Sequence, residues 1–127
     1  MHYKFTVTVE VRTEKGRRFS SFGSISINRD NLQFNSAFAT YTIPQSEVLE
    51  LRYNRKLFPV FIVIGNSNKG ITYAHVSMCR KKKFEEIYKL LDNYEYKFTE
   101  DMKGIGWFKS IKRHNQDIKK YNLYDED

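Results

Sequence analysis

The chain has 127 residues, of which 40% are hydrophobic and 16% aromatic, so we expect one domain with a core rich in large side chains. This composition excludes disordered and fibrous proteins. The formal charge of +7 favours anionic partners such as phospholipid headgroups, nucleic acid or an acidic protein surface, although the same charge can serve only to keep a protein soluble.

The single cysteine, Cys79, cannot form an internal disulfide, which favours a reducing compartment. The first residues run straight into an alternating pattern and contain no apolar segment typical of a signal peptide. The longest apolar run, 58–64, is too short to span a bilayer. We therefore expect a cytoplasmic protein, with a peripheral position at a membrane as the alternative.

Alternating hydrophobicity predicts antiparallel strands over most of the first 78 residues. From Tyr3 to Arg12 apolar and polar side chains alternate, which is the pattern of a half-buried strand. Turns rich in Gly, Asn and Pro separate six further expected strands: 19–27, 32–34, 38–43, 48–53, 58–64 and 71–78. The run 58–64 is apolar on both faces, so we expect that strand to be central in the sheet.

After residue 78 the hydrophobic period becomes helical. Phe84, Ile87, Tyr88 and Leu91 are spaced i, i+3, i+4 and i+7, which predicts an amphipathic helix of about three turns. Between 94 and 99 apolar and polar residues alternate again, so a short extended stretch is expected to carry the chain back across the domain. About seven short antiparallel strands followed by a helix is typical of an α+β fold or a barrel without βαβ units.

The last 34 residues contain a second predicted amphipathic helix, at 106–121. Its apolar side would carry Trp107, Phe108, Ile111, Ile118 and Tyr121. Its basic side would carry Lys109, Lys112, Arg113, Lys119 and Lys120. A basic amphipathic helix lies in a membrane interface, covers an apolar groove of a partner or docks onto its own domain, and the sequence leaves these three roles open.

Three segments share their order with a known superfold. Residues 23–34 contain a glycine, an apolar strand, a turn and Leu-x-Phe; residues 41–49 contain an Ile-Pro step into the next strand; residues 84–91 form the predicted helix. Together they resemble the pleckstrin-homology-like (PH-like) superfold, and more narrowly its bacterial PH and GRAM-type branches. The resemblance implies a barrel closed by the helix within residues 1–93, with residues 94–127 as an extension that packs on this barrel or projects from it.

Two basic clusters are candidate anion-binding sites. Lys15, Arg17 and Arg18 lie on the predicted first hairpin, where the resemblance implies that cations grip inositol phosphates. The second cluster is a run of four cations before the predicted helix: Arg80, Lys81, Lys82 and Lys83. Cations at a helix N-terminus oppose the helix dipole, and a broken local rule can mark a functional surface. The alternative for both clusters is that the charges are simply solvated.

Catalytic motifs are missing from the sequence. His2, His75 and His114 are far apart and lack metal-ligand spacing, and Cys79 has no nucleophile context, so we expect no enzyme, metal site or cofactor. The sequence instead favours a non-enzymatic binding module whose partner is a protein. An anionic membrane surface is the second choice and nucleic acid the third, and homo-oligomerisation is left open.

Overall fold

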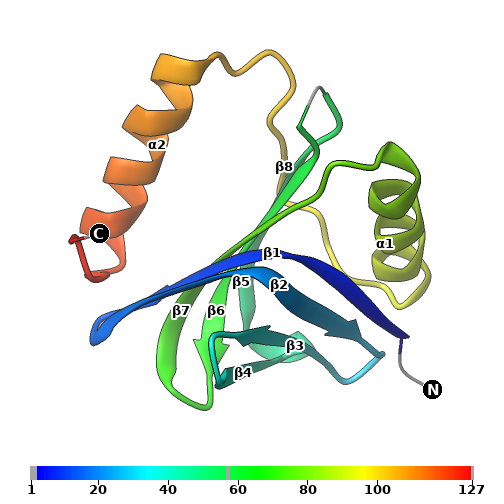
Figure 1. The fold of residues 1–127 in the computed structure, drawn as a ribbon, viewed down its shortest axis with the longest axis horizontal. Helices are drawn as coiled ribbons and strands as arrows, with labels where there is room; N and C mark the ends of the chain where they lie inside the picture. The colour runs from blue at the N-terminus through cyan, green and yellow to red at the C-terminus, as the bar shows by residue number, and fades with distance from the viewer. Residues whose placement is uncertain (1–2, 57, 127) are drawn as a thin grey trace.

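The computed structural model describes residues 3–56 and 58–126. Within these ranges, eight strands form one strongly curved sheet in the spatial order β4-β3-β2-β1-β7-β6-β5-β8 (Figure 1). The strands are β1 (Tyr3–Thr13), β2 (Gly16–Ile27), β3 (Asn31–Ser36), β4 (Ala39–Pro44), β5 (Val48–Asn54), β6 (Val60–Ser67), β7 (Gly70–Ser77) and β8 (Glu100–Asp101). The described helices are α1 (Lys81–Asn93), α2 (Trp107–Lys120) and the short 3-10 helix η1 (Gln45–Glu47) between β4 and β5.

The predicted antiparallel sheet is confirmed, but the predicted count of about seven strands is wrong by one. The additional strand, β8, pairs in parallel with β5, where Glu100 lies opposite Arg52 and Asp101 opposite Tyr53. A strand of two residues is too short to show an alternating pattern, so hydrophobicity alone does not reveal it. The sheet is also an open, curled sheet rather than a closed barrel.

The β4–β5 connection packs closely against β6. Gly65 of β6 lies directly under this connection: a Cβ there would be 2.5 Å from the Glu47 carbonyl oxygen and 2.8 Å from Ile43 Cγ2. Any side chain at Gly65 would therefore push the two halves of the sheet apart.

Both edges of the sheet, β4 on one side and β5 with the short β8 on the other, carry further hydrogen bonds. On β4, the Asn68 N–H donates to the Thr42 carbonyl at 3.2 Å, and Asn68 Oδ1 accepts from the Thr42 N–H at 2.8 Å. On β5, the Thr99 N–H donates to the Leu51 carbonyl at 2.8 Å, just before β8 begins. These contacts occupy part of each edge, so an added strand could not pair along the whole of either edge without displacing them.

The inner face of the sheet is closed by α1, as predicted. Phe84, Ile87 and Leu91 are buried on this helix. The Phe84 ring stacks on Phe61 of β6, with ring centroids 4.4 Å apart and an interplanar angle of 10°. These contacts join α1 to the main core of the sheet.

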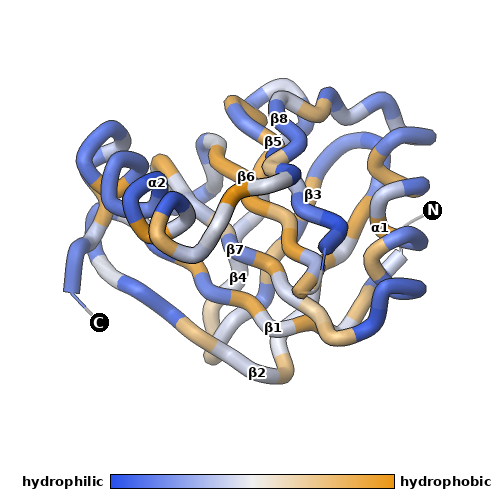
Figure 2. Tube along the Cα trace, turned by 90° about the horizontal axis from the view of Figure 1, so that it is seen from above, coloured by the Kyte–Doolittle hydropathy of each residue, from blue (hydrophilic) through white to orange (hydrophobic). Residues whose placement is uncertain are grey.

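A second apolar cluster lies on the outer face. β6 is apolar on both faces, as expected for a central strand: Phe61 and Val63 join the inner core, whereas Ile62 and Ile64 join the outer cluster. The other buried members of the outer cluster are Tyr73, Met102, Ile118 and Leu123. Figures 1 and 2 show α1 and α2 on opposite sides of β5–β7. Neither helix in the described ranges is long and apolar enough to cross a membrane.

Candidate functional site

The two halves of α2 have different surroundings. In the C-terminal half, Asp117 and Ile118 are buried against the sheet. In the N-terminal half, Trp107 is 71% exposed, Phe108 80% and Ile111 42%. The predicted amphipathic helix is present. Its apolar side docks onto the sheet at the C-terminal end and projects into solvent at the N-terminal end.

Buried ion pairs hold the docked half of α2. The Arg52 guanidinium, 1% exposed, donates to both carboxylate oxygens of Asp117 at 2.7 and 3.0 Å and to Glu50 at 2.6 Å. Tyr121 donates a hydrogen bond to Glu50. Burial opposes the charge of Arg52, but the hydrogen bonds from its guanidinium to Asp117 and Glu50 raise the pKa of Arg52. These hydrogen bonds are directional, so they fix the position of α2 on the sheet in addition to the burial of its apolar side chains.

The structure corrects the interpretation of Arg113. This residue was predicted on the solvated basic side, but it is half-buried and donates to both carboxylate oxygens of Glu100 at 2.7 and 3.1 Å. Asp117 was missed entirely, although its position four residues before Tyr121 places it near the apolar side of the helix. The burial of Arg52 could not be predicted from the sequence, because an arginine in a strand is normally exposed.

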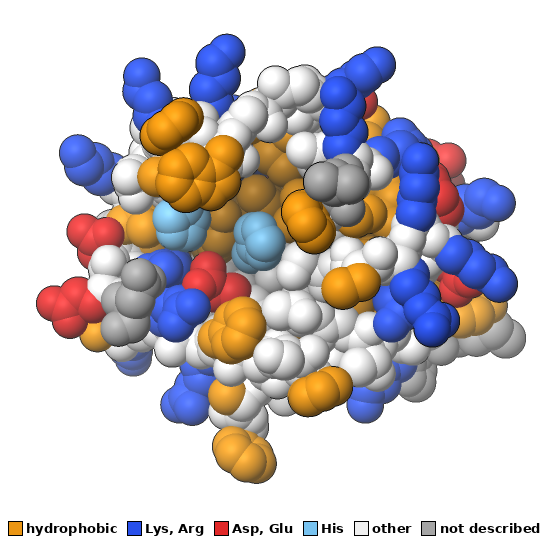
Figure 3. All heavy atoms as spheres, turned by 45° about the horizontal axis from the view of Figure 1, so that its top comes forward, with side chains coloured by type: hydrophobic (Ala, Val, Ile, Leu, Met, Phe, Trp, Pro, Cys, Tyr) orange, Lys and Arg blue, Asp and Glu red, His pale blue; other side chains and the backbone are white. Residues whose placement is uncertain are grey.

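The projecting half of α2 and the outer face of the sheet enclose a hollow of about 380 Å³, which we call the α2 groove. Its lining residues are Thr8, Glu10, Phe19, Ile62, Tyr73, His75, Ser77, Trp107, Ser110, Ile111 and His114. Figure 3 shows the two histidines at a hollow surrounded by hydrophobic side chains. Trp107 and Phe108 contact each other edge to face, with centroids 5.0 Å apart.

The polar groups of the α2 groove are largely paired or neutral. His114 Nδ1 lies 3.3 Å from the Tyr73 hydroxyl. Burial lowers the pKa of His75 although the nearby Glu10 opposes the shift, so this histidine is neutral at pH 7. Glu10 itself pairs with Arg12 and Arg17. The groove therefore offers mainly apolar contact, with a few hydrogen-bonding groups that can orient a ligand.

The first predicted basic cluster surrounds a different hollow, of about 530 Å³, which we call the hairpin hollow. Lys15, Arg17 and Arg18 line it from the β1–β2 hairpin, and Lys69 joins them from the β6–β7 turn. Lys69 was missed because it lies more than 50 residues away in the sequence. Its ammonium lies 4.8 Å from the centroid of the Tyr41 ring, at the same hollow.

The second predicted basic cluster is separate from the first. Arg80 precedes α1, and Lys81–Lys83 form its first turn, which contains no acidic residue. The Lys83 ammonium donates to the Thr6 carbonyl at 2.6 Å. In Figure 1, α1 and the tip of the β1–β2 hairpin lie at opposite sides of the molecule. The structure therefore divides the predicted cations into two surfaces.

No family model and no curated protein sequence matches the chain. Among solved structures, the chain is similar to one described as the structure of the Spt16D Pob3N heterodimer, with a TM-score of 0.53 and 12% identity. The match covers 84% of this chain and 60% of the other. The fold is PH-like. At this identity the similarity shows the fold alone, and the present chain spans about 60% of the length of its match.

Among the described residues, no group of three or more His, Cys, Asp and Glu side chains could hold a metal ion. Of the three histidines, His75 and His114 both line the α2 groove, and His2 lies outside the described residues. Cys79 is exposed. Exposed aromatic side chains stand at the α2 groove, and four cations line the hairpin hollow.

Proposed function

We propose that the chain is a non-enzymatic, cytoplasmic PH-like module that binds a protein partner through the α2 groove. The observation that carries the proposal is the half-exposed helix: Trp107 and Ile111 stand at the rim of a hollow that no described residue fills. The partner would insert an aromatic or aliphatic side chain between α2 and Phe19 of β2. Recognition would follow the general rule that a few aromatic anchors in a pocket supply most of the binding energy.

The position of the groove residues is well suited to such an anchor. Trp107 and Ile111 project from a helix whose other half is held by the pairs of Arg52 with Asp117 and of Arg113 with Glu100. A rim held by rigid elements loses little conformational freedom on binding, which favours affinity. The groove therefore needs little rearrangement to accept a side chain.

The surrounding charge favours an acidic partner segment. Lys109 and Lys112 are exposed on the solvent side of the same helical turns, and the Arg17 guanidinium lies 5.7 Å from the centroid of the Phe19 ring at the opposite rim. Carboxylates beside an apolar anchor would meet these cations and speed association. The matched solved structure is a heterodimer, which supports a protein partner for this fold.

Selection from a phage-displayed peptide library would test the proposal. We expect enriched peptides to combine an aromatic or aliphatic residue with Asp or Glu. Trp107 is the one tryptophan in the sequence, so its emission should shift to shorter wavelength when a selected peptide covers it. Trp107→Ala should weaken peptide binding by at least about tenfold. Phe58→Ala is the matched control, because Phe58 is a similarly exposed aromatic outside the groove.

Two outcomes would contradict this function. One is a selection without enrichment above an unrelated domain. The other is enriched peptides that bind the Trp107→Ala variant as tightly as the original chain. Self-association that buries Trp107 would replace the partner protein by a second copy, and sedimentation over a concentration series would detect it.

A second candidate function, binding of anionic phospholipid headgroups, is favoured by the hairpin hollow. Four cations line this hollow, and each cation near an anionic surface contributes about 1 kcal/mol. Lys15→Glu with Lys69→Glu should abolish sedimentation with phosphatidylserine-containing vesicles, whereas Lys89→Glu with Lys97→Glu makes the same charge change on other exposed positions. Equal recovery on neutral and anionic vesicles would remove this candidate.

A further inference from the structure

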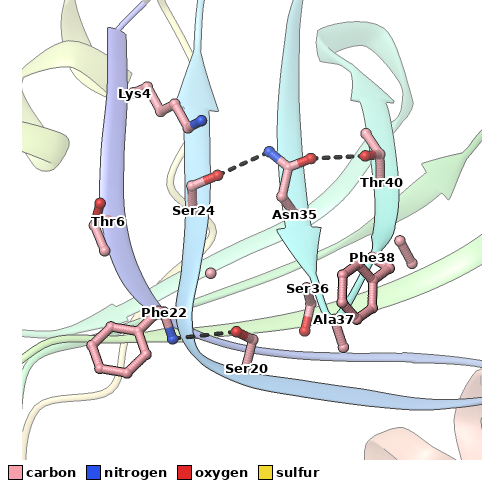
Figure 4. Close-up of a pocket in the computed structure, with 12 residues that line it drawn as sticks. Lys4, Thr6, Ser20, Phe22, Ser24, Asn35, Ser36, Ala37, Phe38 and Thr40 are labelled. Carbon is pink, nitrogen blue, oxygen red and sulfur yellow. Dashed lines mark hydrogen bonds between the residues drawn. The ribbon is translucent and has the colours of Figure 1, made fainter.

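A third hollow, of about 580 Å³, lies on the outer surface of β1–β4. It shares no lining residue with either site above, although Arg18 of the hairpin hollow reaches its edge. We call it the Phe22–Phe38 hollow after the two aromatic residues at its rim. Its other lining residues are Lys4, Thr6, Ser20, Gly23, Ser24, Asn35, Ser36, Ala37, Ala39 and Thr40. Figure 4 shows Phe22 on β2 and Phe38 at the β3–β4 turn, with the polar side chains on the strands beside them.

Phe38 is held in an unfavourable backbone conformation. The two residues of the β3–β4 turn have positive φ, +48° at Ala37 and +70° at Phe38. Two-residue turns of this kind favour Asn-Gly, because a Cβ disfavours the left-handed region. Phe38 is fully exposed, with a relative accessibility of 111%, so its ring gains no packing in return. Strain that the fold does not use points to a role outside the fold.

A second irregularity presents Phe22 at the same hollow. The pairing of β1 with β2 shifts between Val7↔Gly23 and Val9↔Ser20, so Ser21 and Phe22 together lie opposite a single residue of β1. This bulge directs Phe22 outward, where it is 88% exposed. Gly23 is required beside it, because a Cβ there would lie 2.5 Å from the Asn35 carbonyl oxygen.

The walls of the hollow are polar, and its charges are positive. Asn35 accepts from Thr40 at 2.8 Å and donates to Ser24 at 2.9 Å, which arranges hydroxyl and amide groups across three strands. Lys4 lines the hollow directly. Lys83 contacts its lining residue Thr6, and Arg18 donates to the Ala37 carbonyl at 3.3 Å. Among the described lining residues none is acidic, so the hollow suits an anionic ligand.

We propose that the Phe22–Phe38 hollow binds single-stranded nucleic acid. Bases would stack on the exposed rings of Phe22 and Phe38, and phosphates would meet Lys4, Lys83 and Arg18. The hydroxyl and amide groups between them would contact sugars and base edges. Exposed aromatic rings beside a basic groove are the combination that single strands require. A bilayer surface would use the rings and cations but not the polar hollow between them, so the chemistry favours a nucleic acid strand.

Fluorescence anisotropy with labelled 15-nucleotide oligothymidine and oligouridine would test the proposal. Three phosphate contacts predict an affinity about twentyfold lower at 200 mM than at 50 mM salt. Phe38→Ala should weaken binding about tenfold, because each stacked base contributes measurably to affinity. Phe108→Ala is the matched control, since Phe108 is also a largely exposed phenylalanine but lies on α2. Its affinity for the oligonucleotides should be unchanged.

The double substitution Ala37→Asn with Phe38→Gly separates binding from folding. It introduces the residues that the turn prefers, so the melting temperature should rise by about 2–8 °C while oligonucleotide affinity falls. Binding absent at 50 mM salt would overturn the proposal, as would unchanged affinity in both Phe38 variants. Phe38-dependent sedimentation with phosphatidylserine vesicles, without oligonucleotide binding, would overturn it in favour of a membrane. Each result is independent of peptide binding in the α2 groove.

Discussion

The two helices flank one sheet but are attached to it by different forces. α1 buries the apolar side chains Phe84, Ile87 and Leu91 in the main core. α2 buries Ile118 in the smaller outer cluster and is otherwise held by charged contacts, above all Arg52 with Asp117. Apolar burial needs the whole face of a helix, whereas a directional ion pair can fix one end of a helix and leave the other end exposed.

The two helices therefore differ in the apolar side chains that they leave accessible. On α1, Phe84, Ile87 and Leu91 are all buried in the core. α2 keeps Trp107 and Phe108 in solvent, close to a hollow on the outer sheet. The C-terminal extension therefore adds exposed aromatic side chains beside the outer face of the sheet and leaves the main core unchanged.

The largest expected effect is the loss of the α1 contact in the core. Phe84→Ala removes a fully buried ring that stacks on Phe61, so the free energy of unfolding should fall by about 4 kcal/mol. Urea denaturation would measure it. Phe108→Ala removes the same ring from the exposed half of α2 and should change stability by less than about 0.5 kcal/mol. Equal losses in both variants would contradict the difference between the two helices.

The next largest effect should come from the ion pair under α2. Asp117→Ala leaves the buried Arg52 without its bidentate partner and should lower the free energy of unfolding by about 3 kcal/mol. The double variant Arg52→Met with Asp117→Leu removes both charges and should lose less stability than Asp117→Ala. Thermal unfolding followed by circular dichroism would measure the stability of both variants. A double variant less stable than the single one would show that the charges themselves stabilise the helix.

Docking of α2 should also depend on pH, with a smaller effect than either substitution. Burial of Glu50 opposes its charge, but hydrogen bonds from Tyr121 and Arg52 outweigh burial and lower the pKa of Glu50. A lowered carboxyl pKa adds stability above the unfolded value of 4.5, and this stability is lost as the pH falls below it. Melting temperatures between pH 3 and 7 should therefore fall toward the acid end, and Glu50→Gln should flatten that dependence.

At alkaline pH, the stability of the docked α2 should fall as the pH rises, because the pKa of Tyr121 is raised. Burial, followed by the hydrogen bond to Glu50, raises the pKa of Tyr121 to about 12. The stability that this phenol adds is present below its unfolded pKa of 10.0 and is lost as the pH rises toward 12. Burial raises the pKa of Tyr73 and Tyr96 as well, so Tyr121→Phe should reduce the alkaline dependence of stability rather than remove it. Circular dichroism in urea between pH 9 and 12 would measure the reduction. An unchanged alkaline profile would show that Tyr121 does not link α2 to β5.

The smallest expected effect on stability belongs to the rim of the α2 groove. Trp107→Ala should change the free energy of unfolding by less than about 0.5 kcal/mol, because the side chain is 71% exposed. The same substitution should weaken peptide binding by at least about tenfold. Calorimetry with a selected peptide should therefore show a large loss of affinity, while urea denaturation shows almost no loss of stability. A large loss of stability would instead place Trp107 in the packing of α2.

Much of the fold follows from local pattern. The structure contains the elements that three patterns predict. These patterns are the alternation from Tyr3 onward, the run of β6 that is apolar on both faces, and the helical spacing of Phe84, Ile87 and Leu91. The amphipathic helix at 106–121 was predicted equally well. These features depend on neighbours within a few residues, and hydrophobic period reports such neighbours directly.

The candidate sites followed less directly. Lys15, Arg17 and Arg18 share one hairpin and were found together, but Lys69 joins them only because the β6–β7 turn folds beside that hairpin. The strained turn at Phe38 is also hidden, since the sequence Ala-Phe contains no signal for positive φ. Sites assembled from distant segments need the sheet order, which pattern alone does not supply.

By itself, the sequence determined the first seven strands and the two amphipathic helices, because each is set by residue type and short-range spacing. Only the tertiary structure decided how far α2 is buried. The pairing of Arg52 with Asp117, 65 residues apart, docks one half of the helix and leaves Trp107 in solvent. A buried ion pair can be identified only when both of its residues are known to be neighbours. The fold, and not the local sequence, brings those two residues together.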